Sequence, residues 1–222
     1  MFIAIQRAVL HNGCMDLIML GAGGHAHSIL DALAGTQIDA FVVPAQDVTS
    51  ASGLHRKVLE ESRFLATHRT SARIANGIGQ MTPRSARGQA FDRFRSAGFE
   101  FETIIHPSAV VSALATLGEG AQVLAGAIVG PGASVGANTV INSAAIIEHH
   151  CSIGANVHVG PGAVICGDTQ IEDHCMIGAG STIIQGLHVE TGVQLGAGAV
   201  LVSDAHRDQI LAGVPAKPLR VD

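Results

Sequence analysis

The most regular pattern in the chain is an aliphatic residue at every sixth position of its second half. From Ile105 to Leu201 each sixth residue is Ile, Val or Leu, which gives 17 consecutive matches. The residue four positions after each of these is small or β-branched, and Leu187 is the one large exception. A helix repeats its apolar positions about every 3.6 residues and an ordinary strand every two, so this period indicates a different architecture.

A period of six residues fits a short strand and a sharp turn, repeated around a three-sided coil. The aliphatic residue and the small residue then both point inward from the same strand. Gly-rich corners such as Gly130–Gly132 and Gly178–Gly180 suit turns in which φ is positive. Three hexads close a coil of about 18 residues, so this half predicts a parallel β-helix of about six coils with one stacked apolar column.

The first half shows a different pattern. Asp16–Leu20 is an apolar run that predicts a strand, and Phe41–Val43 predicts a second one. Between them lies a glycine-rich turn of the form G-x-G-x-x-A, followed by a segment with helical spacing. Such a turn presents backbone N–H groups at a helix N-terminus, where phosphate binds well; a tight turn without a ligand is the alternative. The candidate residues are Gly21, Gly23, Gly24 and His25.

These patterns divide the chain into four parts. Residues 1–14 form an extension with no assigned role, and residues 15–103 form a small α/β, Rossmann-like domain. No clear acidic residue ends the second strand, so a mononucleotide fits this domain better than a redox dinucleotide. Residues 104–207 form the β-helix, and residues 208–222 form a C-terminal segment.

Charge and composition exclude several classes of function. The net charge is −5, and residues 104–222 carry three Lys and Arg against nine Asp and Glu, so nucleic acid and membrane partners are not expected. The chain has no Trp or Tyr, which argues against a stacking platform for single strands. The cysteines lack metal-site spacing and no convincing secretory leader precedes them, so we expect reduced thiols and a cytoplasmic location.

A basic segment runs from residue 56 to residue 95 and includes Arg87. A solvated helix face is the favoured interpretation, and contact with ligand phosphates is the alternative.

Histidines supply the candidate chemistry of the repeat. His149, His150, His158 and His174 all fall outside the inward aliphatic positions, so none is a core histidine by pattern. An imidazole that titrates near neutrality suits a general base for an attacking amine or hydroxyl. Gly167 follows His149 by 18 residues, so it stacks one coil away and offers a backbone N–H as an oxyanion donor.

Four segments together resemble one family. They are IMLGAGGHAHSIL at residues 18–30, IHPSA at 105–109, NSAAIIEHHC at 142–151 and GVPAK at 213–217. Over roughly residues 15–219 the chain resembles the hexapeptide-repeat sugar acyltransferases of the sialic-acid O-acetyltransferase and PglD type. This resemblance implies a left-handed β-helix, a homotrimer with active sites between subunits, acetyl-CoA as co-substrate and no metal.

The resemblance also implies roles for individual residues. The catalytic residues would be His149 as general base and Gly167 as oxyanion donor. The nucleotide sugar would contact Gly21, Gly23, Gly24, His25, Asn142, Glu148, His150 and His158. Acetyl-CoA would contact His158, Gly167, Gly178, Ala179 and Lys217. One residue departs from the family pattern, because His150 stands where Asp or Glu usually follows the catalytic histidine.

The expected activity is direct transfer of an acetyl group to the amine of a nucleotide-linked 4-amino-4,6-dideoxy sugar. O-acetylation of a sialic-acid-like sugar is the alternative on the same scaffold. Two more distant alternatives are a zinc enzyme like the γ-carbonic anhydrases, with ligands among His149, His150, His158 and His174, and a β-helix without catalysis.

Overall fold

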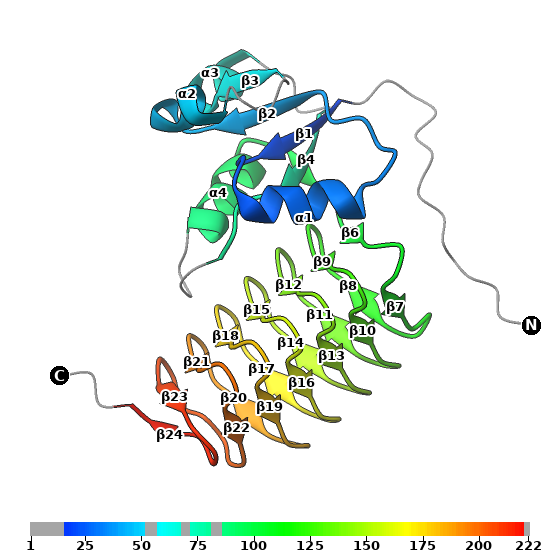
Figure 1. Ribbon diagram of the computed structural model, residues 1–222, viewed down its shortest axis with the longest axis vertical. Coiled ribbons are helices and arrows are strands. Elements are labelled where there is room, and N and C mark those ends of the chain that lie inside the picture. The colour runs from blue at the N-terminus through cyan, green and yellow to red at the C-terminus, as the bar shows by residue number, and fades with distance from the viewer. Residues whose placement is uncertain (1–15, 52–56, 68–71, 81–85, 220–222) are drawn as a thin grey trace, which may run out of the picture.

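The computed structural model describes residues 16–51, 57–67, 72–80 and 86–219. The predicted extension at residues 1–14 and the last three residues lie outside these ranges. The described chain forms an N-terminal α/β domain that sits on one end of a long β-helix (Figure 1).

The N-terminal domain is built on a parallel sheet with the strand order β3-β2-β1-β4-β5, the order found in doubly wound nucleotide-binding sheets. Its strands are β1 (Leu17–Leu20), β2 (Ala40–Val43), β3 (Val58–Glu60), β4 (Arg73–Asn76) and β5 (Glu100–Phe101). Its helical elements are α1 (Gly24–Ala32), the 3-10 turn η1 (Ala45–Asp47), α2 (Val48–Ala51), α3 (Glu61–Thr67) and α4 (Ala86–Ser96). The glycine-rich turn joins β1 to α1, as the sequence predicts.

The β-helix consists of short strands on three faces, two residues long except for β23. One face holds β6 (Ile104–Ile105), β9 (Gln122–Val123), β12 (Val140–Ile141), β15 (His158–Val159), β18 (Met176–Ile177), β21 (Gln194–Leu195), β23 (Ile210–Ala212) and β24 (Lys217–Pro218). A second face holds β7 (Val110–Val111), β10 (Ile128–Val129), β13 (Ile146–Ile147), β16 (Val164–Ile165), β19 (Thr182–Ile183) and β22 (Val200–Leu201). The third holds β8 (Thr116–Leu117), β11 (Ser134–Val135), β14 (Ser152–Ile153), β17 (Gln170–Ile171) and β20 (His188–Val189).

For clarity, we call these the β15 face, the β13 face and the β14 face. Along each face, residues 18 apart pair in parallel, as in Ile128 with Ile146 and Ile147 with Ile165. The predicted inward positions from Ala121 to Ala205 form one continuous buried core, which Leu211 extends and against which the partly buried Leu187 packs. Hexapeptide repeats with parallel three-sided sheets fit the expected left-handed β-helix.

The two ends of the repeat differ from the prediction. The side chain of Ile105, the first predicted inward residue, is 46% exposed because it lies in the terminal coil, with no coil before it. At the other end, Ala205 pairs with Val189, which is 16 residues away instead of 18. Ala205 therefore occupies the position that an aliphatic residue holds in the other coils, and the last coil is two residues shorter than the others. The chain then returns to the β15 face, where β23 pairs with β21 and β24 closes an antiparallel hairpin.

Corners of the coils often have a left-handed residue. His150 and Asp168, with φ of 57° and 59°, occupy equivalent positions in successive coils, and Gly132 and Gly186 occupy the same position in the coils on either side. This conformation costs a non-glycine residue free energy, and the ladder on both sides of the corner enforces it.

None of the described helices is long and apolar enough to cross a membrane.

Candidate active site

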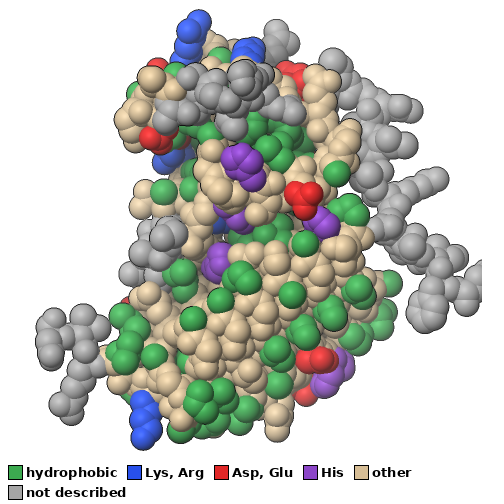
Figure 2. Space-filling model, viewed as in Figure 1, with side chains coloured by type: hydrophobic (Ala, Val, Ile, Leu, Met, Phe, Trp, Pro, Cys, Tyr) green, Lys and Arg blue, Asp and Glu red, His purple; other side chains and the backbone are tan. Residues whose placement is uncertain are grey.

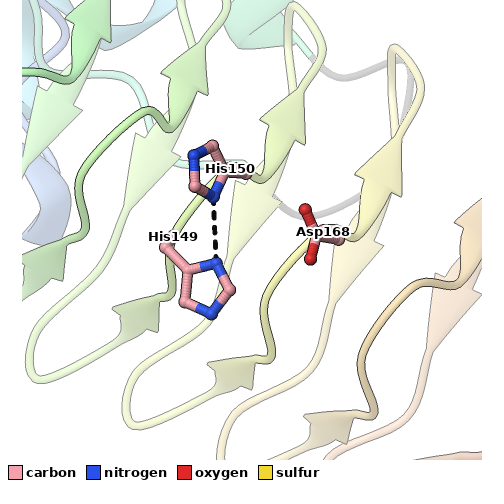
Figure 3. A group of neighbouring side chains, drawn as sticks. All are labelled: His149, His150 and Asp168. Carbon is pink, nitrogen blue, oxygen red and sulfur yellow. Dashed lines mark hydrogen bonds between the residues drawn. The ribbon is translucent and has the colours of Figure 1, made fainter.

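His149 and His150 lie at the corner between the β13 and β14 faces, where both side chains are exposed. Their Nδ1 atoms are 3.1 Å apart, which is a hydrogen-bond distance (Figure 3). Two neutral imidazoles can make this bond only if one Nδ1 carries hydrogen and the other accepts it. Each ring therefore constrains the tautomer of the other.

Gly167 lies directly under the His149 ring. A Cβ atom added at Gly167 would be 2.5 Å from Cε1 and 2.6 Å from Nε2 of His149. The neighbouring Asp168 N–H donates to the His149 carbonyl over 3.0 Å, which fixes the two coils in register. The predicted stacking of Gly167 on His149 is confirmed, whereas its role as oxyanion donor stays a prediction.

Position 150 carries a histidine and no carboxylate, but Asp168 in the next coil brings a carboxylate close to it. One ligating atom each of His149, His150 and Asp168 lie within 4.8 Å of one another. Figure 3 shows Asp168 beside the histidine pair at the adjacent corner. Glu148 is exposed and precedes the pair, and no contact of its carboxylate with either ring is found among the described residues.

A second set of predicted residues lies on the β15 face. A groove of about 280 Å³ runs along this face and is lined by His158, Gly178 and Ala179 together with Met176 and Gln194. Asn142 lies beside it, with its amide nitrogen 3.4 Å from His158 Nε2. The Asn142 oxygen accepts from the Ser143 N–H, so the amide nitrogen is the atom that faces the imidazole.

Lys217 lies on β24, which borders the same face, and its side chain is exposed. In the glycine-rich turn, Gly21 has φ of 78°, which favours glycine, and its added Cβ would meet Ile78 at 3.0 Å. Gly23 and Gly24 are exposed with open space around them. These two glycines leave the N-terminus of α1 accessible.

A buried polar network joins the glycine-rich turn to the β-helix. Arg87 of α4 is fully buried and donates to the carbonyls of Asn76 (2.9 Å), Ile78 (3.0 Å) and Asn138 (3.3 Å). These acceptors come from both domains. Arg87 Nη1 is also 3.5 Å from His25 Nε2. The interpretation of Arg87 as part of a solvated basic face was therefore wrong, because the domain junction encloses its guanidinium.

Gln122 fixes the tautomer of His25. Its amide nitrogen donates to the Asn76 carbonyl over 2.8 Å, so its oxygen is the atom that faces His25 Nε2, also at 2.8 Å. His25 Nε2 therefore carries the hydrogen, and Nδ1 remains an acceptor. Figure 2 shows histidines gathered where the N-terminal domain meets the β-helix.

The network holds two histidines neutral. Burial, then the charge of Arg87, lowers the pKa of His25 to about 4. Burial, then the charges of His25 and Arg87, lowers the pKa of His158 to about 4. Burial also lowers the pKa of Arg87 to about 9. At neutral pH, His25 and His158 can therefore donate or accept hydrogen bonds without carrying charge.

The cysteines divide by position. Cys151 and Cys175 are buried at inward positions, and burial raises the pKa of Cys151 and raises that of Cys175 to about 12. Cys166 is half-buried beside Gly167. All three are free thiols.

The structure thus divides the predicted site residues into two sets. The first set, Glu148, His149, His150 and Gly167, lies at the corner between the β13 and β14 faces. The second set, His25, Asn142, His158, Gly178 and Ala179, lies along the β15 face, across the apolar core from that corner. Sequence analysis missed Arg87, Gln122, Asn76 and Asn138, because no motif marks the contacts of polar residues across a domain junction.

The zinc-enzyme alternative took its ligands from among His149, His150, His158 and His174. Among the described residues, the only group of three or more possible metal ligands is His149, His150 and Asp168, so His158 and His174 do not join it.

Known families and structures resemble this chain. The family described as bacterial transferase hexapeptide (six repeats) matches residues 132–167, and that described as hexapeptide repeat of succinyl-transferase matches residues 169–203. No curated protein sequence matches.

Three solved structures align with most of the chain. The acetyltransferase domain of PglB from Neisseria gonorrhoeae is 33% identical, with 93% of this chain and 100% of that one covered and a TM-score of 0.83; it was also solved with acetyl coenzyme A. PerB from Caulobacter crescentus, in complex with CoA and GDP-perosamine, is 30% identical, with 94% and 99% covered and a TM-score of 0.84. WeeI from Acinetobacter baumannii, at 22% identity, 93% and 100% coverage and a TM-score of 0.81, shows the fold alone.

The fold and these likenesses define an acyltransferase built on a hexapeptide β-helix. The chain belongs to the hexapeptide-repeat sugar acyltransferase family, whose enzymes depend on acyl-CoA.

The buried histidines predict a loss of stability in weak acid. Their folded pKa of about 4 lies below the ordinary value of 6.5, so the unfolded chain binds more protons between these two values. The free energy of unfolding should be highest above pH 6.5 and fall towards pH 4, by on the order of 3 kcal/mol for each histidine. Urea unfolding at several pH values measures this slope.

His158→Gln should flatten the slope, whereas His27→Gln, which changes an exposed histidine beside the Gly23 carbonyl, should leave it unchanged. An unchanged slope in His158→Gln would show that burial of this ring is not the cause.

Proposed function

We propose that the protein transfers the acetyl group of acetyl-CoA to the amine of a nucleotide-linked 4-amino-4,6-dideoxy sugar. The observation that carries the proposal is the likeness, over 94% of the chain, to a structure that holds CoA and GDP-perosamine together. The PglB acetyltransferase domain in complex with acetyl coenzyme A supports acetyl-CoA as the donor.

The chemistry begins with the amine of the sugar. Its nitrogen attacks the thioester carbonyl, and a general base takes a proton from the nitrogen as the N–C bond forms. The C–S bond of the tetrahedral intermediate then breaks, and the thiolate of CoA takes the proton back from the base. No covalent acyl-enzyme is formed, so no cysteine is required.

His149 is the base in this proposal. For Nε2 to accept a proton, Nδ1 must carry the hydrogen and donate it to Nδ1 of His150, 3.1 Å away. His150 thus holds the hydrogen of His149 on Nδ1, as a carboxylate at position 150 would. The Asp168 carboxylate in the same group of side chains favours the cation that forms on His149 during the attack.

Gly167 provides the oxyanion donor. Its backbone N–H makes no hydrogen bond among those found for the described residues, so it is available to the developing oxyanion. The absence of a side chain lets the His149 ring lie against Gly167. Base and donor are therefore close enough to act on one tetrahedral intermediate in this proposal.

The groove on the β15 face holds the pantetheine arm and acetyl group of acetyl-CoA, against His158, Gly178 and Ala179, with Lys217 at the phosphates. The neutral His158 contacts the donor, and its lowered pKa of about 4 makes it a weaker base than an ordinary imidazole. The nucleotide lies at the open N-terminus of α1, against Gly21, Gly23, Gly24 and His25. Asn142 and Glu148 contact the sugar.

A complete site needs two copies of the chain. Within one chain the base at the β13–β14 corner and the groove on the β15 face lie across the core from each other. A cyclic homotrimer places the corner of one copy against the groove of the next, because each heterologous contact joins different surfaces.

Purified protein with acetyl-CoA and a nucleotide 4-amino sugar should release CoA thiol and give a product heavier by one acetyl group. His149→Ala should lower kcat by about 10²–10⁴-fold with folding retained. Thiol release and mass spectrometry of the product measure both. A product whose acetyl group is on oxygen would favour the alternative acceptor.

Cys166→Ala is the matched control, because it changes the residue next to Gly167 without touching base or donor. It should keep most of the activity. Loss of activity in this variant, or normal turnover by His149→Ala, would contradict the direct mechanism with His149 as base.

Gly167→Ala should displace the His149 ring, since the new Cβ would lie 2.5 Å from Cε1. We expect a fall in kcat with little change in thermal unfolding, because the ring is exposed and can swing outward. In the His149→Ala background the same change should cost much less, since the ring it displaces is absent. Equal losses in both backgrounds would separate Gly167 from the placement of His149.

Mixed oligomers test the shared site. His149→Ala lacks the base, and Ala179→Trp fills the groove, so each variant alone should be inactive. Co-expressed subunits that mix at random should recover about a quarter of the sites, those with an intact corner facing an intact groove. Light scattering should give the mass of a trimer. No recovery in purified mixed trimers would mean that each chain carries its own complete site.

A further inference from the structure

We propose that His149, His150 and Asp168 form a binding site for a transition-metal ion such as Zn²⁺, and that the bound ion blocks the general base. The metal is an inhibitor here and takes no part in acyl transfer. Its binding does not depend on the proposed function, whereas the inhibition rests on that function.

The histidine pair supplies two ligands at a suitable spacing. Two nitrogens bound to one tetrahedral zinc at about 2.0–2.1 Å are about 3.3 Å apart. The Nδ1 atoms of His149 and His150 are already 3.1 Å apart. Both side chains are exposed, so small rotations can turn both lone pairs from each other towards a shared ion.

Asp168 supplies the third ligand from the next coil. His150 and Asp168 occupy equivalent left-handed corner positions 18 residues apart, so the ladder brings their side chains to the same edge. One ligating atom from each of the three residues lies within 4.8 Å of the others (Figure 3). Three protein ligands leave a fourth position for water, as in zinc sites that are open to solvent.

Two glycines confine the rings. A Cβ at Gly132 would be 2.8 Å from Cδ2 of His150, and a Cβ at Gly167 would be 2.5 Å from Cε1 of His149. Each ring therefore packs against bare backbone in a neighbouring coil. The two glycines thus leave room for both imidazoles at the same edge.

The surrounding charge favours a cation. Residues 104–206 contain no Lys or Arg, and Glu148 adds a further negative charge next to the pair. Two imidazoles and one carboxylate select zinc, cobalt or nickel over magnesium and calcium, which prefer oxygen ligands. Zinc is the probe of choice, and cobalt reports the geometry of its ligands through its visible spectrum.

Coordination removes the lone pair that catalysis needs. When both Nδ1 atoms bind the ion, the hydrogen that one of them carried moves to Nε2 of its own ring. His149 then has hydrogen on Nε2 and cannot accept the proton of the attacking amine. The same ring thus serves as a base without metal and as a ligand with it.

The full chain is first stripped of metal with EDTA. Calorimetric titration with ZnCl₂ then tests binding without any assay of activity. We expect one ion per chain and a visible Co²⁺ spectrum with nitrogen ligands. His150→Gln and Asp168→Asn should each weaken binding about tenfold or more. His206→Gln, which alters an exposed histidine 3.2 Å from a single carboxylate of Glu190, should bind like the unaltered chain.

Absence of saturable binding, or equal binding by all four proteins, would overturn the site. Inhibition is then read as the ratio of acetyl transfer with and without ZnCl₂ in each protein, and it should follow the binding constants. Saturated zinc without inhibition would overturn the block on His149. Zinc binding by a protein that transfers no acetyl group would leave the site standing and reject the proposed function instead.

Discussion

The coil register is the constraint on which the rest of the structure depends. Most of the backbone hydrogen bonds that join successive coils of the β-helix link residues 17 or 19 apart, such as the bond from the His106 N–H to the Val123 carbonyl. A shift of one residue would move Ile147 and Ile165 out of the core. The aliphatic period therefore fixes which residues reach each corner. Because of this register, His149 lies above Gly167 and His150 lies beside Asp168.

The second constraint is a buried charge at the domain junction, for which none of the described residues supplies a carboxylate partner. Arg87 is enclosed between α4 and the β-helix, and carbonyl groups of Asn76, Ile78 and Asn138 accept its hydrogen bonds. Carbonyl dipoles solvate the guanidinium but do not neutralise it, so its charge adds to burial, the larger cause, in lowering the pKa of His25 and His158. The junction that holds the two domains together thus also keeps two candidate ligand contacts neutral.

The sequence was sufficient for the repeat and insufficient for the junction, for a physical reason. A hexad period is a local rule repeated 17 times, so its register is overdetermined, and the stacking of Gly167 on His149 follows from counting. The period does not predict the exposure of Ile105 or the pairing of Ala205, because a terminal coil has a neighbouring coil on one side only. Arg87 escapes it because burial of a charged residue depends on acceptors that are distant in sequence. The helical period places Arg87 on the same face of α4 as Ala90, Phe91 and Phe94, and Arg93 off that face, but it does not supply these acceptors.

The same register explains why the substitution at position 150 does not remove the carboxylate from the corner. In a helix or a loop, replacing a carboxylate with the histidine at position 150 would leave no negatively charged side chain next to His149. In a β-helix every corner position recurs in the next coil, so Asp168 offers its carboxylate to the same edge. A proton acceptor on His149, a ring that fixes its tautomer and a carboxylate nearby can thus be assembled from two coils instead of one. That assembly has a consequence of its own, because three such groups around one point are also ligands. The arrangement proposed to orient His149 as a base is therefore also an arrangement that can hold a transition metal.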